Sequence, residues 1–211
     1  MTHYEWMGDR AVSIHGLDAR QRRRLMFAPR SDSIWDVVSG PEDLVIYLRD
    51  PLVKDETIST FIEHALRAVS PAEAQEEQEP RCHSFGVRYG GADTDLEDVA
   101  RAQGLSAKQV IALHAICLYR VQATGFTPGF AYLGYVHEAL RMDRKAVPNT
   151  VVAPGAVAVA HHYTGIYPRE SAGGWWILGY LDATDTARLW TLRSSQPGLL
   201  QVGETVQFYP K

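Results

Sequence analysis

The sequence predicts an α+β domain followed by a mostly-β domain that closes into a barrel or a sandwich. The segment SPAEAQEEQEPR at 70–81 is acidic, flanked by proline and poor in large apolar residues, as linkers are. Helical and alternating apolar patterns mix before it, whereas short strand patterns separated by Gly and Pro dominate after residue 118. We therefore predict an N-terminal domain over 1–70, an acidic linker over 71–82 and a C-terminal domain over 83–211.

The N-terminal domain contains three stretches with strand patterns and two with helical patterns. RAVSIHG at 10–16 alternates apolar and polar residues, while SIWDVV and LVIYL flank the turn signal SGPED. LDARQRRRLMFA has the composition of a helix. Apolar residues recur at helical spacing from Ile58 to Val69 and form one stripe. We expect a small sheet with helices on one face, ferredoxin-like or similar.

The C-terminal domain begins with the strand pattern HSFGVRYGG, which two short helices follow. Each helix opens with a capping-box pattern, Thr94 with Glu97 and Ser106 with Gln109. Five short strand patterns come next, which are LYRVQATG, GAVAVAHH, GWWILGYL, LWTLRS and ETVQFYP. This texture predicts a β-barrel or sandwich whose loops are long enough to build a site.

Composition and charge exclude several classes of function. A hydrophobic content of 45% and a charged content of 22% are those of an ordinary globular protein. A net charge of -4 and a pI near 6.0 argue against a nucleic-acid partner. No run approaches the roughly 18 apolar residues that span a membrane, and no secretory signal pattern is visible. With only two cysteines, we expect a soluble cytoplasmic protein without a membrane partner.

The sequence lacks the common nucleotide, nucleophile and zinc motifs. It contains no P-loop, no Gly-x-Ser-x-Gly elbow and no His-Glu-x-x-His. His161 and His162 are adjacent, and on a strand their side chains would point to opposite faces, so we predict no metal site. His114 lies on the apolar side of the second capped helix. Such a histidine is more often a hydrogen-bonded core residue than a catalytic base.

Three Gly-containing loops combine flexible backbone with aromatic rings. They are GFTPGFAYLG at 125–134, VVAPGAVAV, and TGIYPRESAGGWWILG at 164–179. Glycine permits positive φ and close backbone approach. The rings could fill the ends of the barrel, or they could line one concave site together with glycine N–H donors. Composition leaves these two interpretations open.

Five stretches, in this order, are similar to motifs of a known family: GDRAV at 8–12, DLEDVA at 95–100, a segment with His114, Tyr119 and Val121, GFTPGFAYL at 125–133, and TGIYPRESAGGW at 164–175. On these residues the chain resembles the family of allophanate hydrolase subunit 1, PxpB (the B subunit of 5-oxoprolinase) and KipI, which carries a carboxyltransferase domain, subdomain C and D. The similarity covers nearly the whole chain. It implies an α+β N-terminal domain and a cyclophilin-like β-barrel.

The resemblance implies a subunit that acts with a partner, called subunit 2, PxpC or KipA. One implied activity is the ATP-dependent opening of 5-oxoproline to glutamate, with a third, decyclising subunit. ATP is then the implied cofactor, and its site could lie at the interface with the partner because the chain has no nucleotide motif. The alternatives are a KipI-like protein that inhibits a histidine kinase and a diverged paralogue that binds a small ligand without catalysis.

The chain departs from the family pattern at polar positions. It keeps Arg144 and Pro148, but Asn149 and Tyr180 stand where the family has arginine, and Ala156 stands where it has serine. A small carboxylate or cyclic amide substrate with a negative charge needs cations or N–H donors when it is desolvated. The lost arginines therefore weaken the enzymatic interpretation, unless other cations compensate, the candidates being Arg120, Arg141, Lys145 and Arg169.

We predict that the substrate-binding residues lie around one cavity and are Phe126, Pro128, Phe130, Tyr132, Arg144, Tyr167, Gly173, Gly174 and Trp175. Arg144 is the expected anion contact, and His114 is a supporting polar group. These two residues are also the candidates for catalysis. The sequence does not identify a catalytic base.

Overall fold

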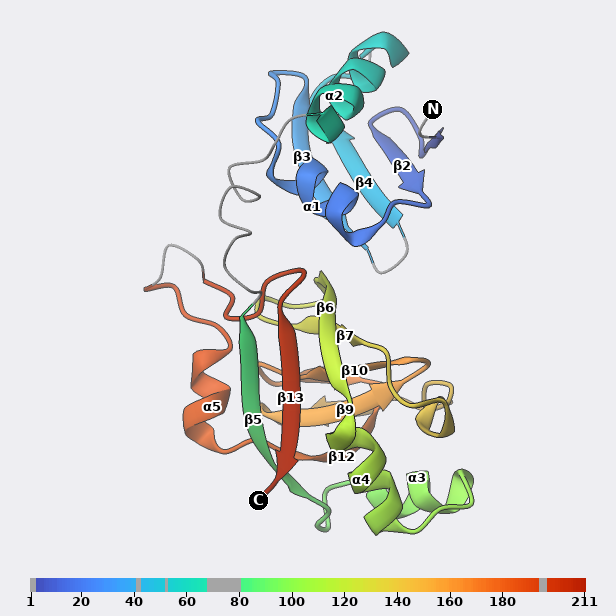
Figure 1. Cartoon of the computed structure of the whole chain (residues 1–211), viewed down its shortest axis with the longest axis vertical. Helices are drawn as coiled ribbons and strands as arrows, with labels where there is room; N and C mark the ends of the chain where they lie inside the picture. The colour runs from blue at the N-terminus through green and yellow to red at the C-terminus, as the bar shows by residue number, and fades with distance from the viewer. Residues whose placement is uncertain (1–2, 41–42, 52, 68–80, 194–196) are drawn as a thin grey trace. The chain divides into compact units, whose positions relative to one another are not determined.

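The computed structural model describes residues 3–40, 43–51, 53–67, 81–193 and 197–211. The chain divides into two compact units, Met1–Pro80 and Arg81–Lys211 (Figure 1). Most of the predicted linker, 71–80, lies outside the described residues. Cys82 begins the first strand of the second unit, one residue before the predicted start of the C-terminal domain.

In the described residues of the first unit, four strands form an antiparallel sheet in the order β1 (Tyr4–Trp6), β2 (Ala11–His15), β4 (Asp43–Leu48) and β3 (Ile34–Ser39). Helices α1 (Ala19–Phe27) and α2 (Asp55–Arg67) pack on one face of this sheet (Figure 1). Val12 and Ile14 of β2 share a hydrophobic core with Ile58 and Ile62 of α2. The apolar stripe of α2 thus faces the sheet as its spacing predicts.

The first unit has the predicted α+β composition. β4 lies between β2 and β3 and is antiparallel to both, so β2, α1 and β3 form a split β–α–β unit. The sheet edge beside β2 is taken by the N-terminal strand β1. A ferredoxin-like arrangement stays a prediction. Helix α1 opens with an unpredicted capping box, in which Asp18 and Gln21 satisfy each other's backbone N–H groups.

In the described residues of the second unit, seven strands close into a barrel, which decides between the two predicted architectures. Around the barrel they are β10 (Tyr163–Ile166), β7 (Ala131–Gly134), β6 (Leu118–Thr124), β13 (Thr205–Pro210), β5 (Cys82–Tyr89), β12 (Trp176–Tyr180) and β9 (Ala156–Ala160). β13 and β5 run parallel, and the other described neighbours are antiparallel. A cyclophilin-like topology stays a prediction.

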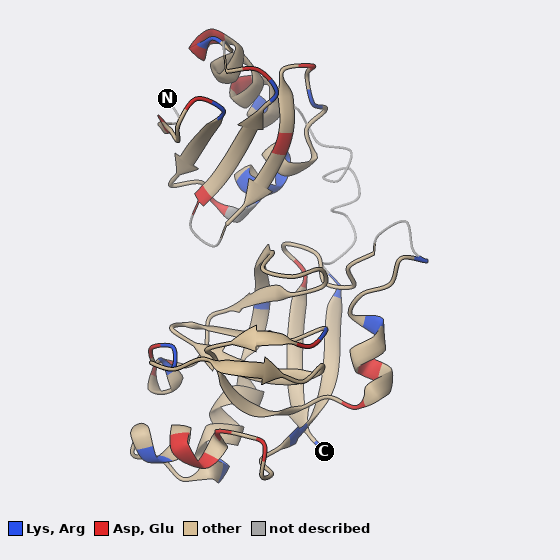
Figure 2. Cartoon of the chain, turned by 180° about the vertical axis from the view of Figure 1, so that it is seen from behind, with Lys and Arg blue, Asp and Glu red and all other residues tan. Residues whose placement is uncertain are grey.

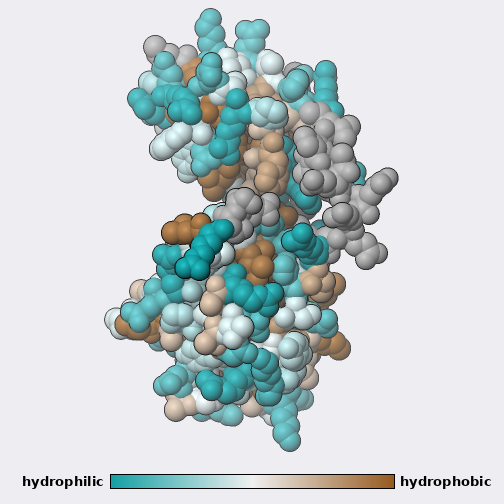
Figure 3. All heavy atoms as spheres, turned by 90° about the vertical axis from the view of Figure 1, so that its left-hand side faces the viewer, coloured by the Kyte–Doolittle hydropathy of each residue, from teal (hydrophilic) through white to brown (hydrophobic). Residues whose placement is uncertain are grey.

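The remaining elements lie outside the barrel wall. They are α3 (Leu96–Ala102), α4 (Ala107–Ile116), the 3-10 helix η1 (Glu138–Leu140), α5 (Ala183–Arg188), and a ribbon of β8 (Asn149–Val152) with β11 (Ser171–Gly173). Charged residues gather on the helices and connecting loops, whereas the barrel strands carry few of them (Figure 2). On the face shown in Figure 3, apolar residues appear in separate small areas within a mainly hydrophilic surface.

One predicted helix cap and one predicted strand are wrong. The N-cap residue of α3 is Asp95 rather than Thr94. The Asp95 carboxylate accepts hydrogen bonds from Ile177 and Lys145, and it makes none to the backbone of the helix. LWTLRS does not form a strand in its described residues. Leu189 ends α5 in helical conformation, and Trp190 makes an isolated bridge with Gly198. The second capping box, at Ser106 and Gln109, is confirmed.

Candidate functional site

The aromatic rings of three separate segments form one contiguous cluster in the second unit. Phe130 lies at its centre, with its ring centroid 5.1 Å from that of Tyr132 and 5.5 Å from those of Tyr167 and Trp175. Phe126 completes the cluster, 5.4 Å from Phe130 and 6.2 Å from Tyr167. These pairs meet edge to face, an arrangement that the ring quadrupoles favour. The structure therefore brings together all five rings predicted for the site.

The ring cluster covers the outside of the barrel wall. Side chains alternate along a strand, so the Ala156, Ala158 and Ala160 side chains of β9 share one face, and they pack with Phe130 in one hydrophobic cluster. Gly165 of β10 makes further room, because a Cβ there would lie 2.8 Å from Cζ of Phe130. Small residues on the wall thus admit large rings above it. The rings do not close an end of the barrel.

The turn that carries Phe126 displays this ring at the edge of the cluster. Phe126 is 60% exposed, whereas Phe130 is 2% exposed. Its φ is 66°, in the left-handed region that bulky residues seldom occupy. The turn is held by hydrogen bonds from the Thr127 N–H to the Gly125 carbonyl and from the Phe130 N–H to the Thr127 carbonyl. Such strain is concentrated at functional sites, where surrounding structure enforces it.

The glycine pair of the third loop brings the chain close to Tyr167 and Arg144. A Cβ on Gly173 would lie 2.8 Å from Cζ of Tyr167, and one on Gly174 would lie 3.8 Å from Cβ of Arg144. Burial raises the pKa of the Tyr167 hydroxyl, while a backbone hydrogen bond from Trp175 and the charge of Arg144 lower it. The Arg144 guanidinium is therefore within electrostatic reach of this hydroxyl. Arg144 itself is exposed.

Pro128 is exposed in the turn between Gly125 and Phe130. Its neighbour Gly129 makes the closer approach, because a Cβ there would lie 2.8 Å from Cβ of Trp190 and 3.2 Å from Cβ of Pro168. The structure thus groups the five rings with Arg144, Gly173 and Gly174, and it leaves Pro128 on the surface. That these residues bind a substrate stays a prediction.

His114 lies apart from the ring cluster, in the buried core, where its ring stacks on Phe208 with centroids 4.8 Å apart. Its Nε2 lies 2.9 Å from the Thr164 hydroxyl, which itself donates to the Ala158 carbonyl, so Nε2 carries the proton. Nδ1 then accepts from the Tyr89 hydroxyl at 2.7 Å. Burial lowers the pKa of His114 to about 3. His114 is therefore a hydrogen-bonded core histidine, the more frequent of the two roles expected for it.

A second feature is a polar cleft of about 570 Å³ on the outside of the barrel. Its charged and polar lining comes from the end of β5 and the loop after it, from the segment that leads into β8 and the start of that strand, and from the end of β12. It includes Arg88, Asp93, Asp95, Lys145, Asn149 and Tyr180. Asn149 and Tyr180 are two of the positions at which the chain departs from the family pattern. The third, Ala156, is fully buried in the core beneath the rings.

Lys145 is held rigidly at the wall of the polar cleft. Its ammonium donates to Oδ1 of Asp95 at 2.6 Å and to Oδ1 of Asn149 at 3.2 Å, and it lies 5.4 Å from the centre of the Trp176 ring. The other carboxylate oxygen of Asp95 accepts from the Ile177 N–H at 2.8 Å. The side chains of Lys145 and Asp95 are 15% and 16% exposed. Asp95 was not predicted as a site residue, although it begins the DLEDVA motif.

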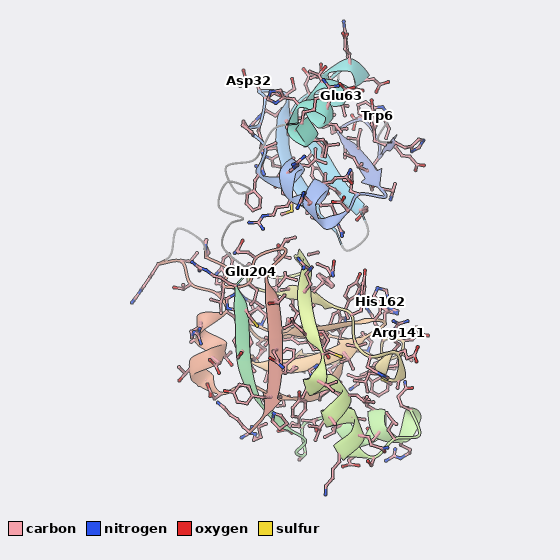
Figure 4. All side chains as sticks on the ribbon, in the orientation of Figure 1. Trp6, Asp32, Glu63, Arg141, His162 and Glu204 are labelled. Carbon is pink, nitrogen blue, oxygen red and sulfur yellow. The ribbon has the colours of Figure 1, made fainter. Side chains whose placement is uncertain are left out.

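Of the four cations considered as compensation for the lost arginines, Lys145 lies in the polar cleft. Arg120 donates to the Gly203 carbonyl, Arg141 follows η1 on the surface (Figure 4), and Arg169 lines a groove with Pro154 and Pro168. Within the described residues, no three His, Cys, Asp or Glu side chains gather closely enough to hold a metal ion. In the same residues no helix has the length and apolar character that a membrane crossing requires.

A family model described as carboxyltransferase domain, subdomain C and D, matches residues 5–200. The chain belongs to this family. The match spans elements of both units, including the turn of Phe126, the loop of Gly173 and the residues that line the polar cleft.

Two curated relatives of this carboxyltransferase-domain chain are named as the B subunit of 5-oxoprolinase. The one from Escherichia coli O157:H7 is 36% identical over 195 residues, which cover 91% of this chain and 84% of the relative. The one from Haemophilus influenzae is 42% identical over 193 residues, which cover 90% and 86%. The solved structure of TTHA0988 has a TM-score of 0.76 and 32% identity, covering 96% of this chain but 39% of that one. The chain thus spans less than half of that longer protein.

Proposed function

We propose that this chain is a subunit of an ATP-dependent amidohydrolase complex that opens 5-oxoproline to glutamate. Relatives named as the B subunit of 5-oxoprolinase, at 36% and 42% identity over about nine-tenths of the chain, support this assignment. The chain acts with a partner resembling subunit 2 (PxpC or KipA) and with a third, decyclising subunit. It is not autonomous, and it works in the cytoplasm, where its two free cysteines, Cys82 and Cys117, remain reduced.

The observation that carries the proposal is the ring cluster with Arg144 beside it. 5-oxoproline is a small, nearly flat lactam that bears one carboxylate. The exposed ring of Phe126 offers an apolar surface for the lactam, and the Arg144 guanidinium, near Tyr167 and Gly174, offers a charged donor for the carboxylate. We assign substrate binding to this group of residues.

The nucleotide binds at the interface with the partner subunit. A phosphate needs convergent N–H donors or cations, and the chain carries no P-loop to supply them. The chain therefore contributes the binding surface for the small substrate, and the partner completes the nucleotide site. This division explains why a subunit with an intact ring cluster would show no turnover alone.

The proposal is tested by expressing the chain with its subunit 2-like partner, purifying the complex and measuring ATP hydrolysis. We expect co-purification and a rate of hydrolysis that rises when 5-oxoproline is added, compared with urea-derived carboxylates or no substrate. The chain alone should show no hydrolysis. If the chain instead captures a histidine kinase and shows no turnover in any combination, it is a KipI-like regulator and the proposal fails. Binding of a small ligand without any partner would indicate the diverged paralogue.

A further inference from the structure

The lining of the polar cleft includes one cationic and one anionic side chain that pair neither with each other nor with another described residue. In the part of the chain that the structure describes, the Arg88 guanidinium and the Asp93 carboxylate have no hydrogen bond or ion pair, although both line the cleft. The other two charges of the cleft are already matched, since Lys145 is paired with Asp95. The cleft is thus neutral as a whole and has one charge of each sign available.

The two available charges share Tyr180 as a neighbour in the lining of the cleft. Burial raises the pKa of the Tyr180 hydroxyl, the carboxylates of Asp93 and Asp95 raise it further, and the Arg88 guanidinium opposes them. Both Arg88 and Asp93 are therefore near this hydroxyl. Tyr180 also donates to the Asp93 backbone carbonyl at 3.2 Å, which fixes the loop that carries the carboxylate.

The rest of the lining is of mixed polarity. Lys145 is anchored by Asp95 and Asn149, and the Oδ1 atom of Asn149 faces the ammonium, so its amide N–H₂ remains as a further donor. Val151, Ala153 and Ile177 add an apolar side. A volume of about 570 Å³ lies in the range of small-molecule sites.

We propose that the polar cleft binds a small amino-acid zwitterion, with Arg88 taking its carboxylate, Asp93 its ammonium and the apolar side its carbon chain. A simple anion would be attracted by the Arg88 guanidinium but repelled by the Asp93 carboxylate. A simple cation would be attracted by Asp93 but repelled by Arg88. A molecule with both groups on a short frame matches both charges. This site is distinct from the ring cluster, and it does not depend on the proposed 5-oxoprolinase activity.

The test is calorimetric titration of the full chain with L-norvaline, pentanoate and n-butylamine. Pentanoate lacks the ammonium of L-norvaline, and n-butylamine lacks its carboxylate. We expect L-norvaline to bind at least about ten-fold more tightly than either of the others. Arg88→Gln and Asp93→Asn should each weaken L-norvaline binding by about ten-fold or more. The matched controls are Arg101→Gln and Asp98→Asn, which remove an exposed pair on α3 outside the cleft.

The proposal is overturned if L-norvaline does not bind, if pentanoate or n-butylamine binds equally well, or if the two cleft variants bind like the controls. Near-ultraviolet circular dichroism of each variant confirms that the fold is retained. Because the titration contains neither ATP nor a partner subunit, its failure leaves the 5-oxoprolinase proposal intact. Conversely, if the complex shows no ATP hydrolysis, a positive titration still supports the zwitterion site.

Discussion

The ring of Tyr167 lies in the space that a side chain at residue 173 would need, with Cζ 2.8 Å from the Cβ position of Gly173. Tyr167 is buried and contacts Phe126 and Phe130, so it cannot move without disturbing the ring cluster. We expect Gly173→Ala to lower the free energy of unfolding by about 1–3 kcal/mol, as overpacking does. Denaturant unfolding measures this loss.

Gly174→Ala is the matched control for this prediction. A Cβ at Gly174 would have its nearest neighbour, Cγ of Pro148, at 3.6 Å, an ordinary contact. Neither glycine has a positive φ, so the comparison isolates the contact with the tyrosine. Equal stability of the two variants would show that the ring of Tyr167 is free to move aside.

The second prediction concerns pH. Burial lowers the pKa of His114 to about 3 in the folded chain, whereas an exposed histidine titrates near 6.5. Below pH 6.5 this histidine is protonated in the unfolded chain but stays neutral in the folded chain. The free energy of unfolding therefore decreases as pH falls from 6.5 toward 3. The slope approaches about 1.4 kcal/mol per pH unit for one proton. His114→Gln should flatten it, because glutamine can still bond to Tyr89 and Thr164 but does not titrate.

Unfolding measured between pH 4 and pH 7 checks this dependence. His161→Gln serves as the comparison variant, since His161 is exposed in the turn after β9, outside the core that holds His114. An unaltered slope in the His114 variant would assign the pH dependence to other groups.

The third prediction concerns the ion pair of the polar cleft. Asp95→Ala leaves the Lys145 ammonium largely buried without its carboxylate and the Ile177 N–H without its acceptor. We expect a loss of about 1–3 kcal/mol in unfolding free energy. Replacing Lys145 by Met in the same chain should recover part of the loss, because it removes the unpaired charge. Asp98→Ala breaks the exposed pair with Arg101 and should cost less than about 1 kcal/mol.

The sequence predicted the ring cluster better than the elements that carry it. The three loops were identified because glycine and aromatic residues combine locally. However, Ala131–Gly134, taken as part of a loop, is the barrel strand β7. Gly and Pro within the preceding turn mask the alternation of this short strand, which pairs with β6 across that turn and with β10 from a distant part of the chain.

The polar cleft could not be predicted in the same way. Its charged and polar residues come from separate segments, represented by Arg88, Lys145 and Tyr180, and no spacing within one segment indicates that they meet. Lys145 was considered only as one of four possible cations. Likewise, the choice of Thr94 over Asp95 as helix cap followed a local pattern, whereas distant partners, Lys145 and Ile177, decide the position of Asp95.

The central claim, that the ring cluster with Arg144 binds the substrate of a 5-oxoprolinase-like complex, is tested most directly with Arg144→Ala. The measurement is 5-oxoproline-dependent ATP hydrolysis by the reconstituted complex, with Arg141→Ala, an exposed arginine of the same connecting loop, as control. We predict that the Arg144 variant loses at least about ten-fold in kcat/KM for 5-oxoproline, whereas the Arg141 variant retains the wild-type value. A wild-type value in the Arg144 variant would contradict the account.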